Sequence, residues 1–494
     1  MNKFKNLILV TLIILSFGYV TAQEKQSQIG EKVEPIVLQA MKSYELTGLA
    51  IGVVKDNEIV YAKGFGVKNI ETKEPITTKS LFHMASVSKP FSATAIMQLV
   101  EQGKVSLDDP VVKYLPYFKV EDERYKEITI RQMLGHISGM PDVSNYHWDK
   151  PEYDDGALER YVRSLTDEEL IAAPGERFSY SNMAFEVLGD LIAKVSGMSF
   201  EDYVKKNILD PLEMHESTFL KKKVSPKLAT TPHVMKLNTV VSDIYPYHRA
   251  HAPSSTLHSN VLEMCNWAMA NMNKGTFKGK IILKPESYDI LWEPAKLNNG
   301  ETGRAGLSWF IRTYREIKTV SHGGGDVGYR TYLIMMPEKS TAAVVLSNCD
   351  FAPTGEITIA ALFTIMGLEP PPIPKTPIRA LISKTIAEKG IEEAIRLYKE
   401  LKENHPESYD FSPRHLNRLG YQLLGMERVT DAIEIFKLNI EVYPKNANCH
   451  DSLGEAYMTN GDKENAIKYY EKALELDPKM ESAITALKKL RKKD

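Results

Sequence analysis

Cysteine is scarce in this chain of 494 residues, and the three that occur, Cys265, Cys349 and Cys449, lie far apart. An odd and widely spaced set predicts no disulfide framework. A charge excess is missing as well, because 62 Lys and Arg residues stand against 64 Asp and Glu residues and the formal net charge is −2. Nucleic acid and anionic lipid are therefore not expected as partners.

Long apolar runs are also missing, apart from Leu7 to Val20, which is too short to span a bilayer comfortably. A basic lead precedes this run, and the small residues Thr21 and Ala22 follow it, as in a secretory signal peptide. We expect residues 1–22 to be cleaved, which directs a bacterial protein to the periplasm or the medium without an integral membrane segment. An uncleaved membrane anchor is the alternative. No cysteine follows closely, so a lipid anchor is not expected.

The Gly-x-Ser-x-Gly elbow of α/β-hydrolases is absent, but another arrangement for nucleophilic catalysis is present. Ser86 and Lys89 stand three residues apart where the amphipathic run from Phe91 to Val100 begins, and no other serine has a lysine at this spacing. Both side chains should lie on one face of a helix's first turn. A lysine made neutral by burial can take the proton of the serine, although an exposed lysine near a helix start is the simpler interpretation.

Two further motifs carry polar groups suited to acyl transfer. Tyr180 and Asn182 form the single Tyr-x-Asn of the chain, placed between a Pro-Gly turn and a helical run. The phenol can relay a proton and the amide can bind a carbonyl; a buried tyrosine and a helix-capping asparagine are the structural alternative. His322 begins a His-Gly-Gly-Gly segment beside a β run, where glycines let a substrate approach backbone N–H groups, or simply form a turn.

The distribution of β-type runs predicts an α+β fold for the first part of the chain. Two runs form a hairpin near the beginning and three lie together much later, with a long helical and loop-rich stretch between them. We expect one antiparallel five-stranded sheet with flanking helices and an inserted helical subdomain. The expected strands are Leu49–Val54, Ile59–Gly64, Glu316–Ser321, Tyr329–Met336 and Thr341–Ser347.

The order Ser-x-x-Lys, Tyr-x-Asn and His-x-Gly resembles the serine β-lactamase and penicillin-binding-protein superfamily. The Tyr-Ser-Asn form is similar to the branch of class C β-lactamases, D-aminopeptidases and esterases. The resemblance covers about residues 28 to 366. Further family-like phrases are Gly103–Pro110, Leu134–Pro141 and Gly306–Trp309.

The resemblance implies a role for each motif residue. Ser86 is expected to be the acylated nucleophile, Lys89 and Tyr180 to share general acid and base work, and Asn182 to hold substrate. His322 takes the third-motif position on the substrate-binding strand. The backbone of this strand includes Gly324 and Gly325, and the N–H of Gly325 is expected to complete an oxyanion hole with that of Ser86.

One departure from the family pattern bears on the substrate. Class C β-lactamases carry Lys where this chain has His322, and a histidine is a weaker cation near neutral pH. Binding of a β-lactam carboxylate is therefore disfavoured, and a small ester, an amide or a D-amino-acid peptide is the expected substrate. The alternative is a catalytically silent hydrolase fold that serves as a receptor or scaffold.

No cofactor is expected, although three histidines that lie close together in the sequence require a metal site to be considered. His248, His251 and His258 have no nearby cysteine or matching carboxylate motif. We interpret this segment as a loop on the rim of the substrate cleft.

A proline-rich stretch, residues 369–377, predicts a stiff linker that separates the hydrolase domain, residues 23–368, from a C-terminal domain of residues 378–494. In the latter, the pattern Leu419-Gly420, Ala432-Ile433, Phe436 and Pro444 recurs thirty-four residues later. This resembles the tetratricopeptide repeat. With a looser earlier copy it predicts three helical repeats and a closing helix over Glu481–Leu490. Such a stack offers a surface for a protein partner, unless it only packs against the hydrolase or steadies a dimer.

Overall fold

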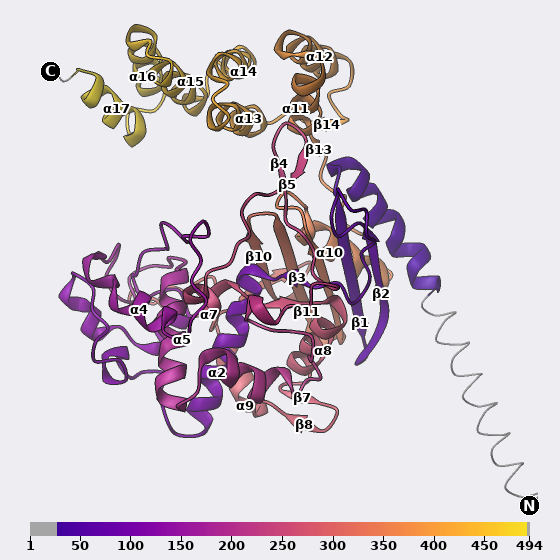
Figure 1. Ribbon diagram of the computed structural model, residues 1–494, viewed down its shortest axis with the longest axis vertical. Helices are drawn as coiled ribbons and strands as arrows, with labels where there is room; N and C mark the ends of the chain where they lie inside the picture. The colour runs from indigo at the N-terminus through magenta and orange to yellow at the C-terminus, as the bar shows by residue number, and fades with distance from the viewer. Residues whose placement is uncertain (1–26, 492–494) are drawn as a thin grey trace, which may run out of the picture. The chain divides into compact units, whose positions relative to one another are not determined.

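The computed structural model describes residues 27–491, and Figure 1 labels its elements. The predicted signal peptide, residues 1–22, lies outside the described residues. The chain forms two compact units. The first contains most of the chain up to Ile373, and the second contains Ser43–Glu45, Met235–Val240 and the chain from Pro374 onward. Within residues 27–491 no helix is both long and apolar enough to cross a membrane.

The first unit is built on one antiparallel sheet of six strands in the order β2-β1-β12-β11-β10-β9. Every neighbouring pair in this order is antiparallel, and the N-terminal and C-terminal parts of the unit meet where β1 pairs with β12. The strands are β1 (Gly48–Lys55), β2 (Glu58–Gly66), β9 (Phe310–Tyr314), β10 (Ile317–Asp326), β11 (Tyr329–Met336) and β12 (Thr341–Ser347).

The prediction of five strands was wrong by one edge strand, β9. This strand joins β10 through Arg315 and Glu316, whose φ angles of 46° and 63° give a tight two-residue turn. Such turns are normally marked by Asn-Gly or Asp-Gly, so this turn gave no signal in the sequence. The expected strand Glu316–Ser321 was too short, because β10 does not end at Ser321 but continues through the glycines to Asp326.

Helices cover both faces of the sheet (Figure 1). On β11, Tyr332 lies beside the start of α10 (Thr354–Ile365), while the neighbouring Thr331 donates a hydrogen bond to the Met84 carbonyl at 2.8 Å. Successive side chains of a strand point to opposite faces. The segment that carries Ser86 and helix α10 therefore lie on opposite faces of the sheet.

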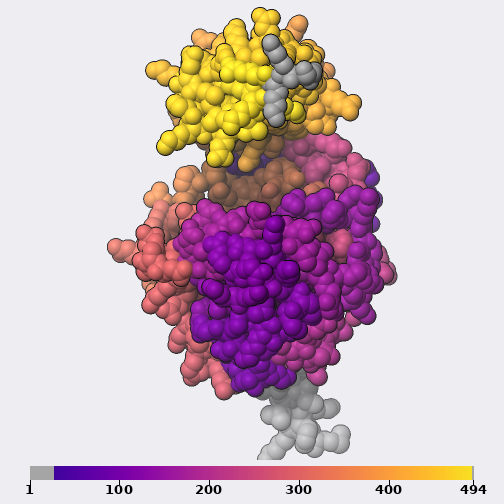
Figure 2. Space-filling model, turned by 90° about the vertical axis from the view of Figure 1, so that its left-hand side faces the viewer, coloured from indigo at the N-terminus to yellow at the C-terminus, as the bar shows by residue number. Residues whose placement is uncertain are grey.

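A helical insert fills the chain between β2 and β9 and forms much of the purple and magenta surface in Figure 2. Its core includes a stack of Phe91 on Trp267 with ring centroids 3.9 Å apart. Its longer helices are α2 (Lys89–Glu101), α5 (Asn182–Ser196) and α8 (Val261–Met272). Its short helices are α3 (Ile130–Leu134), α4 (Ala157–Arg163), α6 (Phe200–Val204), α7 (Ala252–Ser255) and α9 (Pro285–Leu291). Short strands are β3 (Phe82–His83), β4 (His233–Met235), β5 (Thr239–Val241), β6 (His258–Ser259), β7 (Thr276–Phe277) and β8 (Lys280–Ile281).

From Pro374 onward the second unit consists almost entirely of helices, apart from a short parallel pair, β13 (Thr376–Pro377) and β14 (Tyr409–Asp410). The recurring glycines allow the paired helices to approach closely. A Cβ at Gly420 would lie 2.3 Å from the ring of Phe436, and a Cβ at Gly454 would lie 3.0 Å from that of Tyr470. The helices are α11 (Ile378–Lys389), α12 (Ile391–Asn404), α13 (Pro413–Gly425), α14 (Val429–Val442), α15 (Ala447–Thr459), α16 (Lys463–Leu476) and α17 (Glu481–Arg491).

Candidate active site

Ser86 lies in a 3-10 turn, η1 (Ala85–Ser88), that leads directly into α2. Within residues 80–99 Ser86 alone is half-buried, and all its neighbours are buried. Ala85 has a φ of +49°, which an L-residue adopts only at an energetic cost. Strained backbone beside an accessible hydroxyl in an otherwise buried segment is typical of a nucleophile held in a fixed orientation.

The Lys89 side chain is completely buried, and its ammonium group contacts three acceptors. Nζ donates to Ser86 Oγ at 3.0 Å, to the Ser254 carbonyl at 3.0 Å and to Asn182 Oδ1. Burial lowers the pKa of Lys89 to about 8, although nearby carboxylates oppose this shift. The neutral amine, which is the form that acts as a general base, is therefore reached much closer to physiological pH than for an exposed lysine.

Asn182 is the first residue of α5, but it is not the cap of that helix. The cap is Ser181, whose Oγ accepts from the Ala184 N–H at 3.1 Å. The Asn182 amide is instead held by Asp142, whose Oδ1 accepts from both the side-chain and the backbone nitrogen of Asn182 at 2.8 Å. This leaves the amide oxygen facing Lys89. The simpler interpretation of Asn182 as a helix cap was therefore wrong.

Tyr180 lies against the same lysine. The centroid of its ring is 4.9 Å from Lys89 Nζ, and the ring stacks on His136 with centroids 4.2 Å apart. Burial raises the pKa of Tyr180 above its usual range, while a hydrogen bond with Ser86 opposes the shift. Tyr180 is consequently a neutral phenol at physiological pH. It can donate a proton to a leaving group, but it does not supply a phenolate.

His322 is a neutral imidazole on β10. Burial and the positive charge of Lys89 lower its pKa to about 3. A hydrogen bond between Nδ1 and the Gly323 carbonyl at 2.8 Å opposes this shift. Because a carbonyl only accepts, Nδ1 carries the proton and Nε2 is left as an acceptor, which has no partner among the described residues. The third-motif position therefore supplies no positive charge.

The glycines after His322 bring β10 against the nucleophile segment. A Cβ on Gly324 would lie 2.3 Å from the Met84 carbonyl oxygen and 2.4 Å from Thr331 Oγ1, so only glycine fits there. Gly325 is exposed at the next position, and pairing of β10 with β9 ends at Ser321. The backbone of the glycine segment therefore extends past the end of β9. The expected oxyanion role of the Gly325 N–H remains a prediction.

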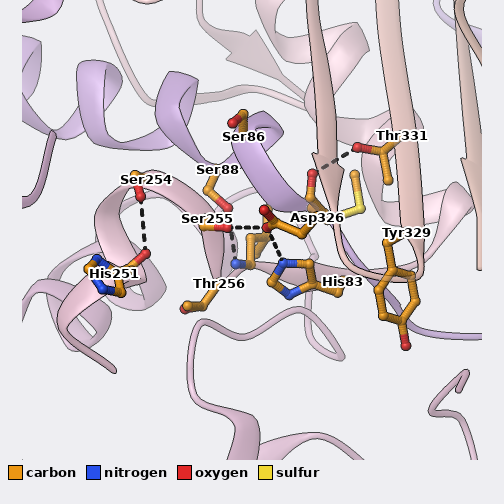
Figure 3. Close-up of polar contacts among 12 residues, drawn as sticks. His83, Ser86, Ser88, His251, Ser254, Ser255, Thr256, Asp326, Tyr329 and Thr331 are labelled. Carbon is orange, nitrogen blue, oxygen red and sulfur yellow. Dashed lines mark hydrogen bonds and ion pairs between the residues drawn. The ribbon is translucent and has the colours of Figure 1, made fainter. Parts of the chain in front are cut away.

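A buried polar cluster, absent from the sequence-based prediction, joins three segments around the nucleophile (Figure 3). Asp326, at the end of β10, accepts from His83 Nε2 at 2.7 Å and from the Ser255 hydroxyl. Ser88 Oγ in turn accepts from the Leu257 N–H at 3.0 Å. These bonds connect β10 to β3 and α7 and, through Ser88, they hold the 3-10 turn that carries Ser86.

The three histidines considered as metal ligands have separate partners. His251 Nδ1 lies 3.2 Å from Glu186 Oε1, His258 Nε2 lies 2.8 Å from the Tyr245 hydroxyl, and His248 Nδ1 accepts from the Ala250 N–H. No group of three potential metal ligands occurs in the described part of the chain. His248 and His251 line a cavity of about 380 Å³ together with residues of α4 and of the loop 143–147.

The structure thus brings Ser86, Tyr180 and Asn182 together around Lys89, whose charge also acts on His322. It adds Asp142, which the sequence-based prediction missed. Its only sequence signal is its position directly after the family-like phrase that ends at Pro141. The arrangement is that expected of a serine acyl-transfer site, with a buried lysine within hydrogen-bonding distance of the serine hydroxyl.

Comparison with known proteins agrees with this class. The beta-lactamase family model matches residues 33–363, and a tetratricopeptide-repeat model matches residues 447–480. The chain belongs to the beta-lactamase and penicillin-binding-protein-like family and carries a C-terminal tetratricopeptide-repeat region. The predicted fold class, a β-lactamase-like α+β domain followed by helical repeats, is confirmed apart from the additional strand.

Among curated proteins the chain is similar to penicillin-binding protein 4* of Bacillus subtilis, with 30% identity over 59% of this chain and 66% of that protein. It is 26% identical to protein flp of Staphylococcus aureus over 64% of this chain and 63% of that protein. The chain therefore spans slightly less than two thirds of the length of these relatives.

Two solved structures are similar. The octameric penicillin-binding protein homologue from Pyrococcus abyssi has a TM-score of 0.61 and 29% identity, covering 73% of this chain and 81% of that one. A class C beta-lactamase has a TM-score of 0.57 and 18% identity, covering 69% of this chain and 96% of that one, which shows the fold alone.

Proposed function

We propose that this protein is a serine hydrolase that forms an acyl-enzyme on Ser86 and hydrolyses a small ester or amide. The observation that carries the proposal is the distance of 3.0 Å between Lys89 Nζ and Ser86 Oγ in a site where the lysine is fully buried. A base within hydrogen-bonding distance of the hydroxyl is what makes a serine nucleophilic. Burying a lysine is costly, and a scaffold without catalysis has no physical reason to keep one here.

The chemistry that follows uses the residues in contact. Neutral Lys89 accepts the proton of Ser86 Oγ as this oxygen attacks the substrate carbonyl, and the acyl-enzyme forms with loss of the leaving group. Tyr180, a neutral phenol, passes a proton to that leaving group and is reprotonated through Lys89. Water then attacks the acyl carbonyl and gives a proton to neutral Lys89, which passes it to Ser86 Oγ as the acid product leaves. Backbone N–H groups of Ser86 and Gly325 are the proposed oxyanion donors.

We favour an ester or a D-amino-acid peptide over a β-lactam as the substrate. The carboxylate of a β-lactam is bound well by a cation, and the third-motif position here holds His322, which is neutral at physiological pH. Its free Nε2 accepts a hydrogen bond and does not attract an anion. A neutral acyl group or a group with an N–H donor suits this position better.

The test is incubation of the purified mature protein, with Ser86→Ala as control, with p-nitrophenyl butyrate, D-alanine p-nitroanilide and a fluorescent penicillin. Turnover of the ester or the anilide that is lost in Ser86→Ala, with slow or no labelling by penicillin, supports the proposal. Rapid labelling followed by release of hydrolysed penicillin identifies a β-lactamase instead. Equal behaviour of wild type and variant with every probe leaves the receptor or scaffold function.

Export and a protein partner are two further proposals. A basic lead and a short apolar core support cleavage after Ala22, and a secreted mass that begins at Gln23 tests it. The repeat region supports a protein partner because stacked repeats present an extended surface. In a pull-down, a chain that ends at Pro377 should lose the partner and keep its Ser86-dependent ester turnover. Retention of every partner by this shortened chain contradicts the idea.

A further inference from the structure

The buried carboxylate of Glu186 lies close to the catalytic lysine but does not contact it. Glu186, one turn after Asn182 on α5, is 0% exposed. Its Oε1 accepts from Ser254 Oγ at 2.5 Å and lies 3.2 Å from His251 Nδ1, while Oε2 has no partner among the described residues. A fully buried carboxylate with one unpaired oxygen is costly in a core. Glu186 therefore has to be explained by something other than stability.

Glu186 is connected to Lys89 through one residue. Ser254 donates its hydroxyl to Glu186, and the Ser254 carbonyl accepts from Lys89 Nζ at 3.0 Å. Ser254 belongs to α7, the short helix that also carries Ser255, the partner of Asp326 (Figure 3). The carboxylate thus fixes the position of the residue on which the ammonium group rests.

Lys89 is surrounded by charged and titratable groups from several elements. The carboxylates are Glu186 on α5, Asp326 on β10 and Asp142 in the loop before α4, and Glu186 has the largest effect of the three. The imidazoles of His136 and His322 have their pKa values lowered by burial and by Lys89, so both are neutral. Tyr180 is neutral too. Around Glu186 itself lie His251 and, packed edge-on against His251, the rings of Tyr146 and Tyr161.

We propose that Glu186 is the positioning residue of the catalytic lysine: through Ser254 it fixes the place of Lys89, and through its carboxylate it controls how readily Lys89 releases its proton. This inference rests on the proposed acyl transfer at Ser86. Glu186 does not touch the nucleophile, and it acts only through Lys89. Burial raises the pKa of the Glu186 carboxyl, and His251, Ser254 and Lys89 oppose that shift by stabilising its charged form.

The sign of the effect follows from the charges. A negative charge near an ammonium group favours the protonated form, so Glu186 opposes the loss of a proton from Lys89. Replacement by glutamine keeps the shape and removes the charge. The neutral amine is then reached at lower pH, and the acid limb of kcat/KM should move to lower pH by about one unit, a tenfold change in proton affinity.

The experiment compares pH profiles of kcat/KM for wild type, Glu186→Gln and Asp190→Asn with an ester substrate, using Ser86→Ala as the blank. Asp190 is the matched control, because it is a buried carboxylate on the same helix, bonded to Tyr117 at 2.6 Å, and the charges with the largest effects on Lys89 are other carboxylates. The acid limb of kcat/KM should move to lower pH in Glu186→Gln and stay in place in Asp190→Asn. This comparison does not depend on the plateau value of kcat/KM in either variant. A limb that coincides with that of wild type overturns the inference.

A second variant keeps the test decisive if Glu186→Gln does not fold. Ser254→Ala removes the hydroxyl that stabilises the Glu186 charge but keeps the carbonyl that Lys89 contacts. The limb should move in the same direction by a smaller amount, and an unchanged limb in this folded variant counts against the inference. Failure of the proposed function is recognised separately, because wild type would then show no Ser86-dependent turnover.

Discussion

Asp142 Oδ1 accepts two hydrogen bonds from Asn182, one from its backbone N–H and one from its side-chain amide, both at 2.8 Å. A carboxylate accepts only, so this pair determines which way round the amide lies. The NH₂ group faces Asp142 and the oxygen faces Lys89. The orientation of a residue predicted to bind substrate thus depends on a loop residue forty positions earlier in the chain.

Replacement of Asp142 by alanine should therefore impair catalysis without removing any group that reacts. The Asn182 amide becomes free to rotate and to place its NH₂ group against the Lys89 ammonium. We expect kcat/KM for the ester substrate to fall by about 10- to 100-fold, as for other misplaced catalytic groups. Asp149→Ala, an exposed position of the same loop, is the matched control and should behave like wild type. Equal activity of the two variants contradicts the positioning role of Asp142.

The parts of the site that could be predicted from the sequence are those whose spacing is itself the signal. Ser86 and Lys89 are three residues apart, so one helical turn brings them together wherever the chain folds. Asn182 was found through its motif. Asp142 was missed because a single aspartate in a loop looks like any other, and its contact depends on tertiary structure alone.

Glu186 had a signal that was not used. It is the one charged residue in the first two turns of α5 and lies four residues after Asn182, so both fall on one face. The sheet was predicted except for β9, whose turn at Arg315 and Glu316 lacks the usual residues. The repeats of the second unit could be predicted because Gly420 and Gly454 recur at a fixed period.

The pH dependence of wild type should show a single acid limb. Lys89 has to be neutral to act as base, and its pKa of about 8 means that kcat/KM rises with pH up to about that value and then levels. His136 and His322 are neutral throughout this range because burial lowers their pKa values, and Tyr180 stays protonated because burial raises its pKa. The measurement is kcat/KM from pH 5 to 10 after subtraction of the Ser86→Ala rate. A limb near pH 6.5 would instead assign the base to a histidine.

Lys89→Met should abolish turnover and raise thermal stability at pH 7. The pKa of Lys89 is lowered from 10.5 to about 8, so holding its charged form in the folded state costs on the order of 3 kcal/mol below pH 8. This cost decreases as pH rises from about 8 towards 10.5, where the unfolded chain also loses its proton. The carbonyl of Ser254 and the amide oxygen of Asn182 lose a donor, which offsets part of the gain.

Thermal unfolding of wild type and Lys89→Met at pH 7 and pH 10 measures this difference. We expect the melting temperature of the variant to exceed that of wild type at pH 7 and the margin to shrink at pH 10. A variant that is less stable than wild type at pH 7 shows that the hydrogen bonds of Lys89 outweigh its burial.

Two adjacent glycines of β10 provide a matched pair. A Cβ at Gly324 meets the backbone carbonyl of Met84 at 2.3 Å, whereas a Cβ at Gly323 meets the ring of Tyr332 at 2.9 Å on the other face. Gly324→Ala has to displace β10 from the nucleophile segment, with an expected stability cost of about 1–3 kcal/mol and a loss of kcat/KM of about 100-fold or more. Gly323→Ala can be accommodated by a shift of the tyrosine ring.

Urea unfolding and ester turnover of both alanine variants test this expectation. At a temperature where both variants are folded, Gly324→Ala should still show the larger loss of kcat/KM. Similar losses in the two variants would show that the close approach of Gly324 to Met84 has no specific role.

The substrate preference should change when a cation is placed at the third-motif position. His322→Lys puts a primary ammonium where the neutral imidazole lies, and two effects follow. A carboxylate-bearing β-lactam gains a partner, so the rate constant for labelling by fluorescent penicillin should rise by about tenfold relative to kcat/KM for the neutral ester. A second positive charge also favours the neutral form of Lys89, so the acid limb for ester turnover should move to lower pH. His322→Gln, which stays neutral, is the control and should change neither the ratio nor the limb. If His322→Lys and His322→Gln label equally slowly with penicillin, the charge at position 322 does not decide the substrate, and the preference has to come from the loops around the site.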